Sequence, residues 1–152
     1  MGIYSILNTS ATGLGAQRLR LDVIADNIAN ATTTRTTEGG AFHKSRVILK
    51  ARDADMKFKT DFLPEALEPG VGSGVRVFSV DKDMETPTRF VYDPSHPDAI
   101  KYGEKAGYVE MPNVNVVTEM VDMIEASRAY EANSTVIQSA KAMFNRALDI
   151  IR

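Results

Sequence analysis

Apolar residues near the N-terminus recur at helical spacing. Successive members are three, four or seven positions apart, which places them on one stripe of a helix over about residues 3–30. Four of them keep a strict seven-residue spacing that suits a coiled-coil seam, although Gln17 and Arg18 interrupt it. The β-branched and polar run 32–40 disfavours helix and indicates a linker. We therefore predict an N-terminal helix within residues 1–31, with its stripe at Ile3, Leu7, Ala11, Leu14, Leu21, Ile24 and Ile28.

A second helical stripe covers the C-terminal segment, residues 112–152. Pro112 and Asn115 mark its start, and no glycine or proline follows. Acidic side chains come early, as at Glu119, and basic ones come late, as at Lys141, which complements the helix dipole. We predict one long helix, with apolar positions at Val117, Met120, Ile124, Tyr130, Ile137, Phe144, Leu148 and Ile151.

The middle segment, residues 41–111, alternates short apolar runs with turn residues. Glycines and prolines such as Pro69, Gly70 and Pro94 separate the runs. This pattern indicates a small β-rich domain of at most five short strands, which can bury little core. The candidate strands are residues 42–50, 75–80, 89–92 and 107–111.

The lengths of these elements bear on the architecture. A helix of about 37 residues is a rod of about 55 Å, whereas a compact globule of this chain length is about 40 Å across. We therefore predict an α+β fold in which the terminal helices form an antiparallel coiled-coil pair around the inserted β-rich domain. Apolar positions that do not belong to the contact between the two helices then face outward. Their exposure favours the interpretation as an assembly subunit over that as a monomeric helical hairpin. They are Val23, Val121, Met123 and Val136.

Composition narrows the chemistry. The 152 residues carry a net charge of −2, so no positive excess is available for binding nucleic acid. The absence of cysteine excludes disulfides and thiolate zinc sites. His43 and His96 have no partner histidine at helical spacing, and the aspartate pairs at 53/55 and 81/83 lack the rest of a calcium loop. We expect no catalytic site, metal, cofactor or small-molecule substrate.

The sequence was also searched for membrane-spanning segments and secretory signals, and neither pattern is found. No apolar run approaches the length of about 20 residues that spans a bilayer. No basic region precedes the apolar residues 3–7, so the sequence predicts no secretory signal peptide. This pattern fits a cytoplasmic protein, and it fits equally one that is exported without a cleaved signal.

Both ends of the chain carry recognisable motifs. Residues 16–32, AQRLRLDVIADNIANAT, resemble the N-terminal signature of the bacterial flagellar rod and hook proteins. Asp22 stands where that family often has asparagine. Residues 89–98, RFVYDPSHPD, and 107–133, GYVEMPNVNVVTEMVDMIEASRAYEAN, are similar to the proximal-rod members of this family. Residues 50–74 match no pattern of the family and are interpreted as a lineage-specific loop.

The resemblance implies a structural role. Members polymerise helically into the flagellar rod, the drive shaft that crosses the periplasm, and leave the cell through the flagellar export apparatus without a cleaved signal. Their terminal helices line the inner tube as coiled coils, and the small β domain lies outside. The expected partners are other copies of the chain, other rod proteins, the basal-body ring and the export apparatus.

The same resemblance assigns the candidate interface to the two helices. We expect the apolar stripes to pack against each other within a subunit, the remaining apolar positions to meet neighbouring subunits, and the asparagine amides to cap helix ends or bridge subunits. A coiled-coil adaptor or chaperone that forms a stable soluble dimer is the alternative, and a small enzyme is a weaker one. The candidate assembly residues are Leu7, Leu14, Leu21, Ile24, Asn27, Ile28, Asn30, Val117, Met120, Ile124, Tyr130, Asn133, Ile137, Phe144 and Leu148.

Overall fold

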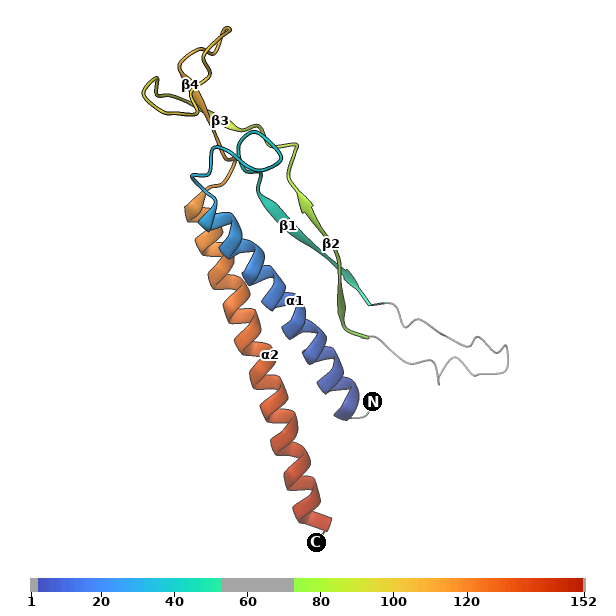
Figure 1. The fold of residues 1–152 in the computed structure, drawn as a ribbon. Coiled ribbons are helices and arrows are strands. Elements are labelled where there is room, and N and C mark those ends of the chain that lie inside the picture. Colours follow the sequence, from blue (N-terminus) through green and yellow to red (C-terminus); the bar gives the residue numbers. More distant parts are fainter. Residues whose placement is uncertain (1–2, 53–72, 152) are drawn as a thin grey trace, which may run out of the picture.

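The computed structural model describes residues 3–52 and 73–151. Two long helices and two short β-hairpins form an elongated molecule, with β3 and β4 at the end opposite the C-terminus (Figure 1). In chain order the elements are α1 (Ile3–Ala29), β1 (Ser45–Ala51), β2 (Val75–Lys82), β3 (Arg89–Tyr92), β4 (Tyr108–Met111) and α2 (Val116–Ile151).

The predicted helices and strands are confirmed to within a few residues. Helix α1 has 27 residues and α2 has 36, so α2 is about 54 Å long. Asn115 is the N-cap of α2, because its Oδ1 accepts a hydrogen bond from the Val117 N–H at 3.0 Å and its carbonyl oxygen accepts one from the Glu119 N–H. This is the start that Pro112 and Asn115 predicted.

Helices α1 and α2 lie side by side and run in opposite directions (Figure 1). The two helices together with two small antiparallel sheets confirm the α+β class. Helix α2 extends past the first turn of α1, because it is nine residues longer (36 against 27). A coiled-coil geometry for this pair stays a prediction, as does the separate domain character of residues 41–111.

The strands form two separate two-stranded antiparallel sheets, β1–β2 and β3–β4. An irregularity between Ile48 and Leu49 shifts the register of the first sheet, which lies along α1 (Figure 1). Val77 and Phe78 of β2 are exposed, so this sheet buries little on its outer side. Of the predicted loop 50–74, residues 53–72 lie outside the described part.

Most of the buried apolar side chains are small. They lie along the contact between α1 and α2 and at the base of the β-hairpins: Ala16, Ile24, Ala41, Val109, Ala126 and Ala140. A core of alanines contributes little apolar area per residue, at about 25 cal/mol per Å² buried. The fold of one chain therefore rests as much on polar contacts as on apolar burial.

Candidate assembly interface

Asn27 joins the C-terminal end of α1 to both β1 and α2. Its side chain is 1% exposed and forms two hydrogen bonds with the main chain of Ser45. The Asn27 Nδ2 donates to the Ser45 carbonyl oxygen, and its Oδ1 accepts from the Ser45 N–H, each at 2.9 Å. The same Nδ2 donates to Glu119 Oε2 at 3.0 Å. The amide therefore pairs with β1 as a neighbouring strand would.

Glu119 is the buried charge at this place. It is 1% exposed, and Lys44 Nζ lies 2.5 Å from its Oε1. The Lys44 main chain is held as well, since its N–H donates to Asn113 Oδ1 at 2.8 Å. A buried carboxylate without a partner costs several kcal/mol, so the ion pair and the Asn27 amide are what make its burial tolerable. We call Asn27, Lys44, Ser45, Asn113 and Glu119 the polar junction.

Small side chains form the buried contact between the two helices. On α2, Ala126 and Ala140 are almost fully buried, and on α1 Ser10 is buried. Asn133 lies midway between the two alanines, and a Cβ atom on Gly13 would come within 3.1 Å of its Nδ2. A side chain larger than that of glycine at position 13 would therefore press on the Asn133 amide.

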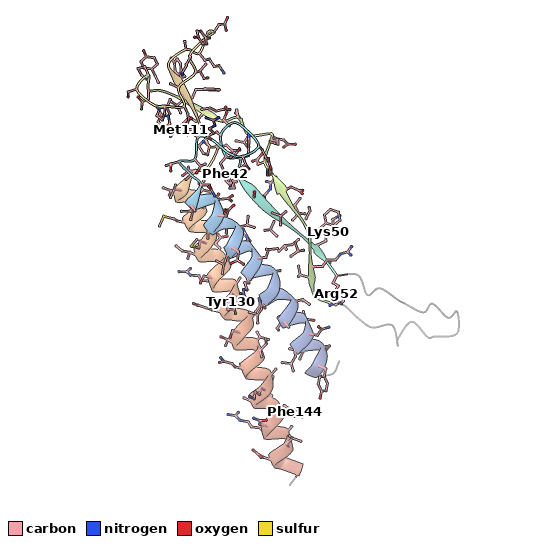
Figure 2. The ribbon with its side chains drawn as sticks, viewed as in Figure 1. Phe42, Lys50, Arg52, Met111, Tyr130 and Phe144 are labelled. Atoms are coloured by element: carbon pink, nitrogen blue, oxygen red, sulfur yellow. The ribbon has the colours of Figure 1, made fainter. Side chains whose placement is uncertain are left out.

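The large apolar side chains of α2 lie outside that contact. The expectation that they pack against α1 within one chain is wrong for five of them, which are between 42% and 71% exposed. The buried row of α2 begins at Glu119 and continues through Ala126 and Ala140. Figure 2 shows Tyr130 midway along α2 and Phe144 near its end. The five are Val117, Met120, Ile124, Phe144 and Leu148.

The remaining apolar candidates occupy intermediate positions. Ile24 is buried, Tyr130 is 39% exposed, and Leu7, Leu14, Leu21, Ile28 and Ile137 are half-buried. Of the positions expected to face outward, Val121 and Val136 are exposed, whereas Val23 and Met123 are half-buried. Each of these half-buried side chains therefore keeps part of its surface in contact with solvent in the single chain.

Two further candidate amides form local hydrogen bonds. Asn30 Nδ2 donates to the carbonyl oxygen of Asp26 at 3.0 Å and to its Oδ1 at 2.9 Å, so Asn30 caps the end of α1. Asn133 Nδ2 donates to the Ala129 carbonyl oxygen at 3.0 Å, one turn earlier in α2. Helix capping by Asn30 is thus confirmed, and bridging between subunits stays a prediction.

The sequence interpretation missed Lys44 and did not assign Glu119 to a buried pair. It also passed over the alanines that line the helix contact. One signal was available: Glu119, Ala126, Asn133 and Ala140 are each seven residues apart. That row contains no large apolar residue, so a search for hydrophobic periodicity gives it no weight.

A cavity of about 300 Å³ opens beside the polar junction, between α1, β1 and the first turns of α2. Arg20, Arg46 and Asp122 contribute charged groups of both signs to its wall.

Within residues 3–52 and 73–151, no three acidic or histidine side chains gather as a metal site. In the same residues no helix is long and apolar enough to cross a membrane. Asp53 and Asp55 lie outside the described part.

The acidic side chains of two exposed turns are stabilised in their charged form. The Thr86 hydroxyl and N–H both donate to the carboxylate of Asp83 and lower its pKa. A hydrogen bond from Lys82 Nζ at 2.6 Å, together with the charge of that ammonium, lowers the pKa of Glu38. These groups order turns at the surface and converge on no common point.

Comparison with known proteins identifies the family to which this chain belongs. The family model described as "Flagella basal body rod protein" matches residues 7–35, and the model "Flagellar basal body rod FlgEFG protein C-terminal" matches residues 105–150. The flagellar basal-body rod protein FlgC of Borreliella burgdorferi is 55% identical over 152 residues, covering 100% of this chain and 99% of that protein. The chain belongs to the FlgC family of flagellar basal-body rod proteins.

FlgC proteins of two further bacteria are also similar to this chain. The FlgC proteins of Bacillus subtilis and Salmonella typhimurium are 36% and 34% identical, each over 99% of this chain and about as much of their own length. This FlgC-family chain is a structural subunit of the flagellar rod and a component of the basal body. The two family models together cover most of α1, β4 and nearly all of α2, and the similarity to the FlgC proteins extends over the whole chain.

Proposed function

We propose that the chain polymerises helically through α1 and α2 to build the proximal rod, the drive shaft that transmits torque. The observation that carries this proposal is the set of large apolar side chains that α2 leaves exposed near its start and near its end. In an isolated monomer these side chains would stay exposed to water. Contiguous exposed apolar patches mark interaction surfaces. The subunit performs no catalysis; its work is to transmit force through packed helices.

In the assembled rod the helix pair completes its packing. The half-buried Leu7, Leu14, Leu21 and Ile28 on α1 and the exposed Val117, Met120 and Ile124 on α2 meet neighbouring subunits. Covering an exposed side chain of this size stabilises by about 1.5–3 kcal/mol when burial is complete. The pair then packs as a coiled coil, and the β-hairpins stay outside it.

The family also suggests the partners and the route. Other copies of the chain and other rod proteins are the direct neighbours, and the basal-body ring and the flagellar export apparatus are further partners. The chain reaches the rod through that apparatus without a cleaved signal, and the rod crosses the periplasm. Family membership favours this assignment over an adaptor that forms a stable soluble dimer.

Deletion and complementation test the proposal. Electron microscopy of basal bodies from a strain lacking the chain is expected to show no complete rod, and an intact rod would overturn the proposal. Complementation with Leu21→Asp or Ile124→Asp is expected to leave cells non-motile, because each places a carboxylate in a contact that assembly buries. Tyr102→Asp is the matched control, since Tyr102 is 88% exposed at the far end of the molecule.

A further inference from the structure

The outer hairpin, β3–β4, is joined to the rest of the chain through loops. Of the described helices and strands, none packs against β3 or β4 apart from its partner strand in the hairpin (Figure 1). We propose that the side-chain amide of Asn113 fixes the direction of this hairpin on the helix pair. The inference concerns the orientation of parts within one chain, so it holds whether or not copies of the chain polymerise.

Asn113 replaces one hydrogen bond at the end of the β1–β2 ladder. Directly beyond that sheet, the Asp83 N–H donates to the Lys44 carbonyl oxygen at 2.7 Å. In a regular antiparallel pair the Lys44 N–H would donate back to the Asp83 carbonyl oxygen. Here it donates to Asn113 Oδ1 at 2.8 Å, and Asn113 Nδ2 donates to the Asp83 carbonyl oxygen at 3.2 Å. The amide group is therefore inserted between the two chain segments.

The same amide holds the turn that leads from β2 into β3. Asn113 Nδ2 also donates to the Thr86 carbonyl oxygen at 3.3 Å, so both amide hydrogens and the amide oxygen have partners. The turn has a defined shape of its own. The Asp83 carboxylate accepts from the N–H groups of Glu85 and Thr86, each at 3.1 Å, and from the Thr86 hydroxyl at 2.8 Å. Asn113 therefore positions a turn that Asp83 keeps closed.

Both connections of the hairpin meet at Asn113. The chain enters β3 through the turn just described and leaves β4 through the segment that contains Asn113. The amide is also bound to the main chain of Lys44, whose ammonium pairs with the buried Glu119 of α2. Ser45, the next residue, is held by the Asn27 amide of α1. The direction of the hairpin is therefore set relative to both helices, and a force on it passes to them, through one side chain.

Other contacts of the hairpin define its direction less well. Among the described residues, the Thr34 hydroxyl donates to Asp98 Oδ2 at 2.8 Å, in the loop between β3 and β4. Arg35 Nη1 lies 4.0 Å from Asp98 Oδ1, but its side chain is 81% exposed, and such pairs contribute little. Val109 is the one buried side chain of β3 and β4, and apolar packing is non-directional. The three hydrogen bonds of Asn113 go to three different main-chain groups and so define a plane.

Spin-label distances test this assignment, since the chain has no cysteine of its own. Labels are attached at Tyr102→Cys, in the loop between β3 and β4, and at Glu131→Cys, an exposed position of α2. The labelled chain is diluted in unlabelled native chain, so that only distances within one chain are recorded. Every labelled chain also carries Thr34→Val, which removes the hydroxyl contact with Asp98 and leaves the hairpin to Asn113.

Asn113→Asp keeps the oxygen that accepts from Lys44 and replaces both donors by a second oxygen, which faces the carbonyl oxygens of the turn. We expect one narrow distance with native Asn113 and a distribution about twofold broader with Asn113→Asp, because the base of the hairpin then opens locally. Asn115→Asp is the matched control, since aspartate caps a helix as well as asparagine does. It is expected to leave the distance unchanged. Far-ultraviolet circular dichroism is expected to show the same helix content in all these chains.

Each other result would overturn the inference. A broad distribution with native Asn113 would assign the direction of the hairpin to Thr34. A narrow distribution with Asn113→Asp, or a broad one with Asn115→Asp, would show that the amide of Asn113 does not set the direction. If Asn113→Asp loses helix content, Asn113→Ala, which adds no charge, takes its place under the same criteria. Loss of helix content in both variants would show that Asn113 is required for folding rather than for direction.

Discussion

Replacing Lys44 by methionine isolates the energetic role of the polar junction. The substitution keeps the unbranched apolar stem, one atom shorter, and removes the ammonium that lies 2.5 Å from Glu119 Oε1. The carboxylate then retains the hydrogen bond from Asn27 Nδ2 at 3.0 Å but loses its counter-ion in a site that is 1% exposed. The prediction is a large loss of stability from a residue that contributes almost nothing to the apolar core.

The magnitude follows from burial. Removing one partner of a fully buried ion pair costs about 3–5 kcal/mol, because a charge is left uncompensated. The Lys44 side chain is 25% exposed, so water reaches the site in part and about 3 kcal/mol is expected. Lys44→Met combined with Glu119→Gln removes both charges, and the glutamine carbonyl still accepts from Asn27. That double variant is expected to stay within about 1 kcal/mol of the native chain.

Urea unfolding of the purified chain, followed by far-ultraviolet circular dichroism, measures these differences. Lys82→Met is the matched control, because the pair of Lys82 with Glu38 is 50% and 72% exposed and such pairs contribute little. The reasoning is refuted if Lys44→Met behaves like Lys82→Met. It is refuted equally if the double variant loses as much stability as the single one.

Three further outcomes follow from the structure. Thr86→Ala is expected to raise the pKa of Asp83 toward its ordinary value in an NMR titration. In the native chain the charged Asp83 stabilises the fold at pH values above the ordinary carboxyl pKa, and this stabilisation is lost as the pH falls through the lowered pKa. Ala126→Leu is expected to cost about 1–3 kcal/mol by overpacking in thermal unfolding, whereas the exposed Ala132→Leu leaves the midpoint unchanged. Gly74→Ala is expected to lower the midpoint as well, because φ is 97° and a Cβ would overlap a threonine hydroxyl of α1.

The sequence alone was enough to locate every described helix and strand. Periodicity and the lack of glycine and proline after Pro112 predicted α2, and turn residues separated the four strands. Local signals suffice for this, because the spacing of apolar positions along a helix or strand shows its period regardless of the element it packs against. The terminal motifs likewise pointed to the rod family, and the comparisons confirm that family.

Which faces meet was decided only by the tertiary structure. Asn27 and Glu119 are 92 positions apart, and nothing in either helix alone shows that an amide and a carboxylate will share one buried site. Helix α2 carries large apolar side chains and a separate row of mostly small residues, and hydrophobicity alone predicts that the large apolar ones are buried. Within one chain the small row is buried, because glycine and alanine let the backbones approach closely enough for the polar junction to close. The large apolar side chains are left exposed within the chain, and we propose that neighbouring subunits cover them.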